Sequence, residues 1–381
     1  MNSDFLLYVL VLSLFNSALS PIVSFLGFFD EIIVLFIVVQ ILLRRNFDYT
    51  REVRLCILVF IFYLIHSLIQ SNNLQTATFR DFIIFTKPFV CLYVAQYYGM
   101  DFSETVKQKC RRVVIFLGIC IWLIAPFIDK IYYNTASYYP ICAYTGMTYM
   151  ILSNFRKKDW LIATLFFAPG LLSIRAKFFA VFVIWIYIVF FLKQRIKLNI
   201  KFILISAVLL YIIYRINFDK IMMYTVNGLD EGAARTYLYY VSIDVLKDYF
   251  PFGPGFGTFA TDSAGKIYSP LNYKYDLDII WGLRPEDIMS GHNFYSDTFY
   301  PILAQFGIVG VILFVAFLKK RWDNINSLVN FELYKISFFL FLFLITQCIA
   351  GNYFTSSDSL PVMLILGFLL SQKNNIMYSI K

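Results

Sequence analysis

The chain has 381 residues, of which 60% are hydrophobic, 20% aromatic and 15% charged, and its formal net charge is +9. Because soluble domains carry about 25% charged residues, this composition excludes an ordinary soluble domain and favours an integral membrane protein. All six cysteines lie in or beside apolar runs, which argues against a disulfide framework or a cysteine metal site.

Apolar runs recur along the whole chain, and each approaches the roughly 20 residues that a helix needs to cross a bilayer. We therefore expect an all-α polytopic membrane protein with about twelve transmembrane helices, a single membrane domain over residues 1–381 and no cleavable signal peptide. The expected spans are 5–20, 22–43, 55–70, 82–99, 113–128, 138–153, 160–173, 178–193, 200–216, 297–317, 335–352 and 361–372.

Basic residues are distributed unequally between the short connections of these spans. Every second connection carries a basic cluster, whereas the remaining short connections together carry only Arg80, Lys130, Arg175 and Lys177. Since Lys and Arg concentrate in cytoplasmic loops, we expect both termini in the cytoplasm. The positive net charge is thus explained as a topology signal, and nucleic acid is not expected as a partner.

Residues 217–296 form one large polar loop, which this topology places on the outer side of the membrane. Apolar residues at helical spacing predict an amphipathic surface helix over Ala233–Tyr249, which Pro251 ends. Gly253, Gly255 and Gly257 then predict a tight backbone path back toward the bundle. We expect residues 265–283 to be irregular, with aromatic side chains that suit either a bilayer interface or stacking on sugars.

Three cations near the outer surface are candidate ligands for an anion. Arg175 and Lys177 lie in a short outer turn, where the guanidinium fork fits phosphate oxygens; the alternative is a snorkelling pair at a helix end. Arg235 opens the surface helix, where the helix dipole disfavours a cation. Either a bound anion or an ion pair with Asp230 or Glu231 would resolve that conflict.

His292 lies where the loop meets the tenth span, beside Gly291 and Asn293. An imidazole with a pKa near 6.5 can take a proton from a sugar hydroxyl at neutral pH, although a hydrogen-bonded structural histidine is the alternative. Arg284, Glu286 and Asp287 are close enough in sequence to orient it.

Arg80 lies at the outer start of the fourth span, where charge marks either a substrate site or a surface pair with Asp81. The other histidine, His66, falls on an apolar face and is interpreted as a satisfied buried residue. The sequence contains no phosphate-binding P-loop, no nucleophile elbow and no His/Cys cluster, so neither a metal nor another cofactor is expected.

Three of these stretches together resemble the O-antigen polymerase (Wzy) and O-antigen ligase superfamily of bacterial inner-membrane proteins. They are Ser173–Arg175, the block from Arg235 to the Pro251-x-Gly-x-Gly-x-Gly run, and His292-Asn293 followed by Ala304–Gly310. The expected number of spans and the single late periplasmic loop extend the resemblance over nearly the whole chain.

The resemblance implies a metal-independent glycosyltransferase that uses a sugar chain linked to undecaprenyl diphosphate at the periplasmic face. Arg175 and Arg235 would hold the diphosphate and His292 would activate the acceptor hydroxyl. We expect further substrate contacts from Lys177, Arg80, Arg284, Asn293 and Gly255. The implied partners are the lipid-linked glycan donor and acceptor, membrane lipids and a chain-length regulator protein.

The favoured function is polymerisation of lipid-linked repeat units into O-antigen, capsule or exopolysaccharide. One alternative is an O-antigen ligase that moves the finished glycan onto lipid A-core, because both enzymes use the same leaving group. A second alternative is a flippase for lipid-linked oligosaccharide, for which charges within several spans and two similar halves of the chain would be expected.

Overall fold

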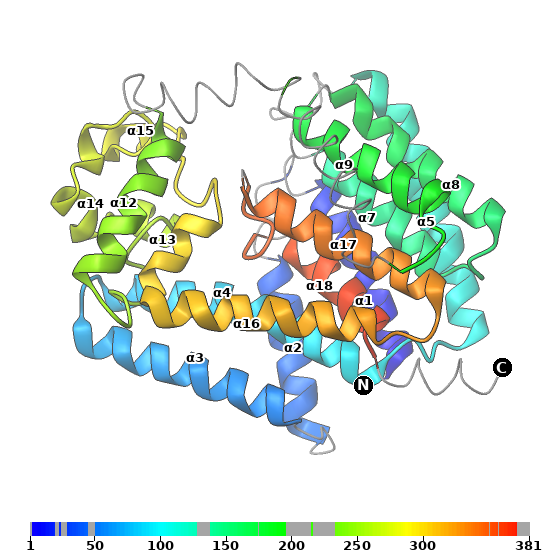
Figure 1. Ribbon diagram of the computed structural model, residues 1–381, viewed down its shortest axis with the longest axis horizontal. Helices are drawn as coiled ribbons and strands as arrows, with labels where there is room; N and C mark the ends of the chain where they lie inside the picture. The colour runs from blue at the N-terminus through cyan, green and yellow to red at the C-terminus, as the bar shows by residue number, and fades with distance from the viewer. Residues whose placement is uncertain are drawn as a thin grey trace.

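The structure is a computed structural model that describes residues 2–19, 23, 29–44, 50–127, 138–173, 175–195, 215, 233–349, 351–356 and 358–371. These residues form helices and connecting turns, with no strand among them (Figure 1). The all-α class predicted from the sequence is therefore confirmed for this part of the chain. The expected span 200–216, apart from Arg215, and residues 217–232 of the loop lie outside the described residues.

Most of the first half of the chain is helical. Its elements are α1 (Ser3–Leu19), α2 (Phe29–Arg44), α3 (Arg51–Gln70), α4 (Gln75–Tyr98), α5 (Glu104–Ile124), η2 (Ala125–Phe127), α7 (Tyr138–Ile151), α8 (Lys157–Phe167), η4 (Ala168–Ser173), α9 (Ala176–Ile186) and the π-helical turn η5 (Tyr187–Phe191).

The second half begins with short elements and ends with three longer ones. They are α12 (Ala234–Asp248), α13 (Asp262–Lys266), α14 (Pro270–Lys274), η6 (Leu277–Ile279), α15 (Pro285–Met289), η7 (Tyr300–Phe306), α16 (Gly307–Asn326), α17 (Phe331–Ile349) and α18 (Ser359–Leu369). The helices α12 to α15 gather at one end of the molecule, at the left of Figure 1, where α3 ends.

Four helices in the described part of the chain are long and apolar enough to cross a membrane: Arg51–Gln70, Glu104–Phe127, Tyr300–Asn326 and Phe331–Ile349. The protein is therefore an α-helical membrane protein, but the structure does not provide the twelve full-length spans expected from the sequence. Several of the expected spans instead correspond to helices too short to cross a hydrocarbon core of about 30 Å at 1.5 Å per residue.

The helix α18 shows why an apolar run need not become a full-length span. All 11 residues of α18 are buried within the protein. Gly367 packs so closely on α4 that an added Cβ would overlap the carbonyl oxygen of Leu92. Small residues permit such close contact between membrane helices. The hydrophobicity of α18 thus reflects contact with neighbouring helices.

Two other expected spans are interrupted. The run 160–173 begins within α8, which ends after 11 residues and continues as the 3-10 segment η4. The run 178–193 is α9, followed by the π-helical segment η5. A change of helix type of this kind ends the regular hydrogen-bond ladder, which a hydropathy pattern cannot show.

The described part of the outer loop is more regular than its sequence indicates. The predicted surface helix is present as α12, with Leu238 and Val245 fully buried. Residues 265–283 were expected to be irregular, and this prediction is wrong. They contain short helices that begin at capping side chains: Thr261 accepts from the Ala264 amide (3.1 Å) and Ser269 accepts from the Leu271 amide (3.3 Å).

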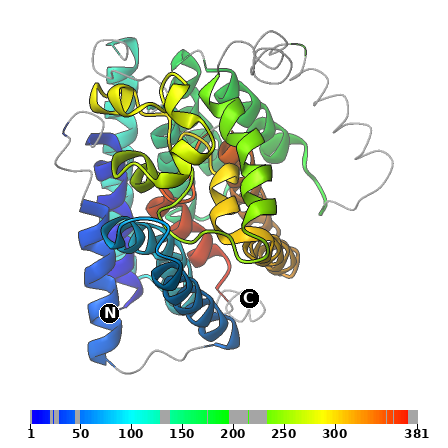
Figure 2. The same ribbon diagram turned by 90° about the vertical axis from the view of Figure 1, so that its left-hand side faces the viewer.

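The helix α3 lies at the front of the molecule in Figure 2, below the loop helices. Its last turns contact η7 through the Tyr63 hydroxyl, which donates to the Phe306 carbonyl (2.8 Å), and the loop through the Ser67 hydroxyl, which accepts from the Phe256 amide (2.8 Å). Its first turn contacts α16 through an ion pair between Glu52 and the buried Arg321. The helix is thus fixed at both ends, while much of its middle is exposed.

Candidate functional site

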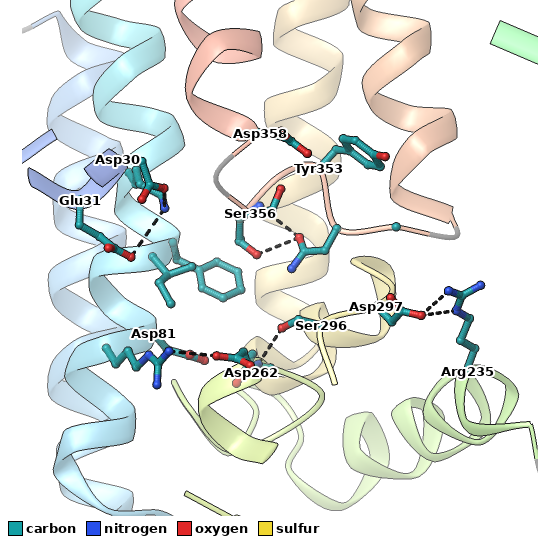
Figure 3. Close-up of a pocket in the computed structure, with 18 of the residues that line it drawn as sticks. Asp30, Glu31, Asp81, Arg235, Asp262, Ser296, Asp297, Tyr353, Ser356 and Asp358 are labelled. Carbon is teal, nitrogen blue, oxygen red and sulfur yellow. Dashed lines mark hydrogen bonds and ion pairs between the residues drawn. The ribbon is translucent and has the colours of Figure 1, made fainter. Parts of the chain in front are cut away.

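A polar cavity of about 510 Å³ lies where the outer loop meets the helices (Figure 3). Five parts of the fold form it: the start of α2, the start of α9, one face of α4, the α17–α18 connection and the loop. Its charged lining residues are Asp30, Glu31, Arg80, Asp81, Lys87, Arg175, Lys177, Arg235, Asp262, Asp297 and Asp358. The cavity therefore brings cations and carboxylates together in one site.

Four cations that the sequence singled out line this cavity. We call Arg80, Arg175, Lys177 and Arg235 the basic group. They come from α4, the start of α9 and the start of α12, so residues up to 155 positions apart in sequence are brought together by the fold. Arg175 is the N-cap residue of α9, and Arg235 lies in the first turn of α12. Each helix start adds a positive partial charge, so the arrangement favours a multivalent anion.

The guanidinium of Arg235 contacts a carboxylate that the sequence did not suggest. Its Nε lies 2.7 Å from Oδ2 of Asp297, and its Nη2 contacts the same oxygen. Both side chains remain partly exposed to the cavity, at 26% and 36%. Two nitrogens of the guanidinium thus share one carboxylate oxygen of Asp297.

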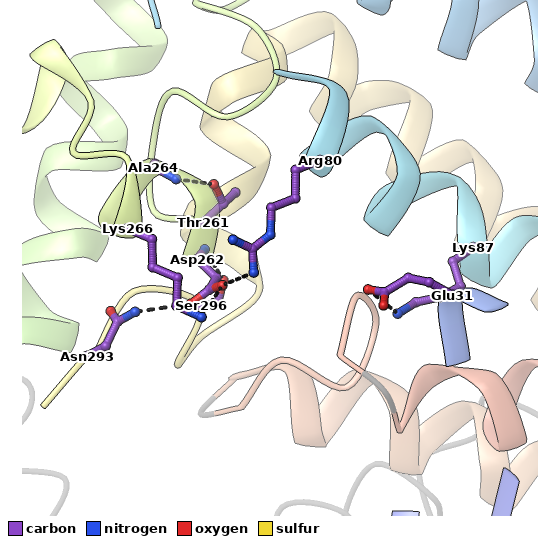
Figure 4. Close-up of polar contacts among 9 residues, drawn as sticks. All are labelled: Glu31, Arg80, Lys87, Thr261, Asp262, Ala264, Lys266, Asn293 and Ser296. Atoms are coloured by element: carbon purple, nitrogen blue, oxygen red, sulfur yellow. Dashed lines mark hydrogen bonds and ion pairs between the residues drawn. The ribbon is translucent and has the colours of Figure 1, made fainter. Parts of the chain in front are cut away.

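Arg80 pairs with Asp262 of the loop at 3.0 Å and not with its neighbour Asp81 (Figure 4). The same carboxylate accepts from Asn293 (3.1 Å) and lies 3.0 Å from the Lys266 ammonium. The Asp262 amide donates to the Ser296 hydroxyl at 2.7 Å. This network fixes the loop segment that forms one side of the cavity.

Three carboxylates on the other side of the cavity in Figure 3 form what we call the acidic group: Asp30, Glu31 and Asp358. The Lys87 ammonium contacts Asp30, and both side chains are almost fully buried, at 3% and 2% exposed. Glu31 lies 3.9 Å from the same ammonium. One cation thus contacts two of the three carboxylates.

Asp358 lies in the connection between α17 and α18, outside both helices. Burial raises the pKa of its carboxyl from 3.8 to about 6; the Ser17 hydroxyl lowers the pKa, and the negative charge of Asp30 raises it further. The carboxylate can therefore exchange a proton close to neutral pH.

The sequence reasoning missed the carboxylates of this cavity. Asp30, Glu31, Asp297 and Asp358 were not singled out as site residues. A usable signal was present, because acidic residues next to apolar runs are costly in a membrane and mark functional sites.

His292 lies outside the lining of the cavity. Its side chain is exposed, with Nδ1 at 3.2 Å from the Ser290 hydroxyl and the ring centre at 5.8 Å from that of Trp281. Its amide donates to the Asp287 carbonyl (2.8 Å). The role of His292 as a base stays a prediction, and this position gives it no support.

Arg284 also lies outside the cavity. Its Nε donates to Oδ2 of Asp287 at 2.8 Å, and this hydrogen bond holds the pKa of that carboxyl below its usual range. The Asp287 carboxylate accepts from the Gly282 amide (2.8 Å). Arg284 therefore stabilises the local turn before His292 and does not reach the basic group.

The glycine run packs against α3 and α4 and does not line the cavity. Gly255 has φ +101°, and a Cβ there would overlap the Ser67 side chain. Its amide donates to the Gln305 carbonyl (2.9 Å). The predicted substrate contact of Gly255 thus has no counterpart in the cavity lining, and the glycine is required for close packing. His66, interpreted as a satisfied buried residue, lies 2.9 Å from the Gly253 carbonyl.

An apolar crevice of about 290 Å³ lies next to the polar cavity, between α3, α4 and α16. Its lining contains the aromatic rings Phe60, Phe85, Phe89, Phe256, Phe299, Phe306, Phe314, Phe317 and Phe354. Phe85 lines both spaces, so one side chain separates the charged cavity from the apolar crevice. Glu52, near the start of α3, and Lys320, in the second half of α16, also line the crevice.

No cluster of three or more His, Cys, Asp or Glu residues in the described ranges is arranged to hold a metal ion. In comparisons with known proteins, no family model, no curated protein and no solved structure matches the chain.

Proposed function

We propose that the protein is a glycosyltransferase that joins oligosaccharide repeat units carried on a polyprenyl diphosphate, such as undecaprenyl diphosphate. One observation carries the proposal: the basic group, Arg80, Arg175, Lys177 and Arg235, lines a single cavity that shares the side chain of Phe85 with an adjacent apolar crevice. A diphosphate attached to a long hydrocarbon chain requires these two environments side by side.

The charges of the basic group suit the departure of a diphosphate. When the bond between the anomeric carbon and the diphosphate breaks, negative charge develops on the leaving oxygen. Fixed cations that already face this position stabilise the transition state without reorganising, and such stabilisation usually contributes more to catalysis than any other single effect. Guanidinium groups are well suited, because they stay charged and bind phosphate oxygens in pairs.

The crevice between α3 and α16 is proposed to hold part of the polyprenyl chain. Its lining is almost entirely aromatic and aliphatic, and both flanking helices belong to the four that are long enough to cross a membrane. An isoprenoid chain would transfer from lipid to this surface at little cost, since both surroundings are apolar.

The topology expected from the sequence forms part of the proposal. It comprises about twelve spans, both termini in the cytoplasm, and a cavity that opens to the periplasm from a bacterial inner membrane. The unequal distribution of basic residues supports it. A chain-length regulator protein remains a proposed partner, from the resemblance alone.

Two alternatives remain. An O-antigen ligase would use the same leaving group and differ only in its acceptor. Transport of lipid-linked oligosaccharide is favoured by one observation, the buried ion pair between Lys87 of α4 and Asp30 of α2, because paired charges inside membrane helices are typical of transport pathways.

The test is glycan analysis of a deletion strain that expresses either the wild-type protein or Arg235→Ala. The matched control is Lys247→Ala, on the same helix, whose ammonium forms an exposed pair with Asp244. For Arg235→Ala we expect surface core with a single repeat unit, and for Lys247→Ala the wild-type polymer. Bare core with polymer on the lipid carrier would identify a ligase. Repeat units retained on the cytoplasmic face would identify a transporter.

A further inference from the structure

The two sides of the cavity differ in charge. The basic group of four cations is accompanied by three carboxylates, Asp81, Asp262 and Asp297. The acidic group of Asp30, Glu31 and Asp358 is accompanied by Lys87 alone. In Figure 3 the acidic group lies across the cavity from Asp262, Asp297 and Arg235. A diphosphate would be repelled by the acidic group, whereas a neutral hydroxyl group would find acceptors there.

Asp30 retains an oxygen atom without a partner among the described residues. Its Oδ2 contacts Lys87, but its Oδ1 is buried and accepts no hydrogen bond. A buried acceptor left in this state costs about 1–3 kcal/mol. Because Asp30 lines the cavity, a hydroxyl group of a bound sugar can satisfy this oxygen.

Asp358 has a favourable position for a helix cap but does not form one. It is the N-cap residue of α18, yet its carboxylate accepts no hydrogen bond from the first turn of that helix. The groups that face it are Ser17 of α1, Asp30 of α2, Tyr139 and Tyr144 of α7, and Tyr353 of the same connection. All of them are neutral near pH 7 except Asp30. Lys87 of α4 lines the same cavity, but its ion pairs are with Asp30 and Glu31.

We propose that the acidic group binds the acceptor sugar, with Asp30 accepting a hydrogen bond from it and Asp358 acting as the general base that removes the proton of the attacking hydroxyl. This inference rests on the proposed glycosyl transfer, and it assigns the base to the cavity and not to the exposed His292.

The acceptor oxygen forms a bond to the anomeric carbon of the donor while the bond from that carbon to the diphosphate oxygen breaks. The hydroxyl proton moves to the Asp358 carboxylate, and the electron pair of the broken bond stays on the diphosphate, which the basic group holds. Base and leaving group lie on opposite sides of the sugar, so the configuration at the anomeric carbon inverts. The proton then passes from Asp358 to water in the cavity.

Two observations support Asp358 over its neighbours as the base. The carboxylate of Asp30 is already engaged by the Lys87 ammonium, which makes it a poorer proton acceptor. Burial raises the pKa of Asp358 to about 6, which is close to the value at which a general base works best near neutral pH.

The experiment uses the full-length protein in vesicles, with lipid-linked repeat units extracted from the deletion strain as substrate. The variants are Asp358→Asn, Asp358→Glu and His292→Ala, with Glu286→Gln as a control, since Glu286 is exposed and lies outside the cavity. Turnover, KM and the pH dependence of turnover are measured for each.

We expect Asp358→Asn to lower kcat by about 10²-fold or more, with KM within about threefold of wild type. The wild-type rate should rise as the pH increases through about 6, and this limb should disappear in Asp358→Asn but persist in Asp358→Glu. Glu286→Gln should behave as wild type. A merely structural role of Asp358 would not remove the pH limb selectively.

The inference is overturned if the wild-type protein makes polymer and Asp358→Asn does so within about threefold of its rate. It is overturned equally if His292→Ala removes the pH limb and Asp358→Asn retains it. In both cases the proposed function stands. If the wild-type protein makes no product from the lipid-linked units, the proposed function fails and the assignment of the base fails with it.

Discussion

The backbone amide of Gly257 donates a hydrogen bond to the buried carboxylate of Asp81 at a distance of 2.9 Å. Asp81 lies on α4 and lines the polar cavity, whereas Gly257 ends the glycine run of the outer loop. This bond joins the loop to the helices at the edge of the cavity. The position of the loop residues Asp262 and Asp297 therefore depends on packing between Gly257 and α4.

Replacing Gly257 by alanine should destabilise the protein. Gly257 has φ +73°, and an added Cβ would lie 2.7 Å from the backbone carbon of Ala77. Backbone atoms cannot move aside as a flexible side chain can, so the loop must shift away from α4. We expect a loss of at least about 1 kcal/mol in the free energy of unfolding, measured as a lower Tm in detergent. Gly291→Ala is the control, because no atom lies within 4 Å of its Cβ position. Because Gly291 also has a positive φ, of +91°, the control measures the cost of backbone strain alone. Equal losses of stability in both variants would argue against the close contact between Gly257 and Ala77.

Asp81→Ala should destabilise the protein by breaking the same contact from the other side. The Gly257 amide would then be buried without an acceptor, at a cost of about 1–3 kcal/mol. Asp81→Asn keeps an acceptor oxygen and should recover most of the loss. Asp244→Asn, on the exposed face of α12, is the surface control. A Tm for Asp81→Ala equal to that of Asp244→Asn would show that the contact contributes nothing.

Arg235→Ala should separate activity from stability. The Arg235–Asp297 pair is partly exposed, and such pairs contribute about 0–1 kcal/mol, so Tm should hardly change. Loss of one cation that meets developing negative charge should lower kcat by about 10²- to 10³-fold. Arg235→Lys should remain well below wild type, because an ammonium cannot provide two parallel hydrogen bonds to a phosphate. A large fall in Tm together with the loss of activity would indicate a structural role instead.

Local features of the fold could be predicted from the sequence. The spacing of Leu238 and Val245 predicted α12, and Pro251 correctly marked where the helix cannot continue. The location of Arg80, Arg175 and Arg235 on the outer side, inferred from the charge distribution, stays a prediction, although all three line the same cavity. The prediction of α12 succeeded because it depends on residues close together in the chain.

Features that depend on contacts between distant residues could not be predicted. The contact between Arg235 and Asp297, 62 residues further along the chain, was not predicted. The alternative considered for Arg235, a pair with Asp230 or Glu231, lies outside the described residues. The run that forms α18 has the hydrophobicity of a span, and only the packing of α4 against it shows that protein surrounds it. Periodicity reports that a face is apolar, but it does not report whether lipid or protein covers that face.

Filling the apolar crevice should impair a lipid-linked substrate specifically. Ala316 of α16 lines the crevice, so Ala316→Trp should occupy part of its volume of about 290 Å³. Val315→Trp is the matched control, because Val315 is the preceding residue, is 57% exposed and does not line the crevice. We expect Ala316→Trp to raise KM for the full-length lipid carrier at least about tenfold, and to affect a short-chain analogue of the donor much less. Equal effects of the two substitutions on both donors would argue against this site for the polyprenyl chain.

Asp358→Asn should make the folded protein more stable at neutral and alkaline pH. The pKa of Asp358 is about 6 in the folded protein and 3.8 as the ordinary value, so folding favours the protonated form. Above pH 6 the buried carboxylate is ionised and destabilises the fold, at 1.36 kcal/mol per pKa unit, or about 2–3 kcal/mol in all. The neutral amide removes this cost.

The stabilisation should therefore depend on pH in a defined direction. The difference in Tm between Asp358→Asn and wild type should be largest at pH 8 and should decrease as the pH falls below about 6. It should become small as the pH approaches 3.8, the ordinary pKa of an aspartate. There the carboxyl is protonated in the folded state and increasingly so in the unfolded state. Thermal unfolding in detergent between pH 4 and pH 8 measures it, with Glu286→Gln as the exposed control. A difference that stayed constant over this range would mean that Asp358 acts through packing and not through its charge.

A variant that is more stable yet inactive would be typical of a residue retained for catalysis at the expense of stability.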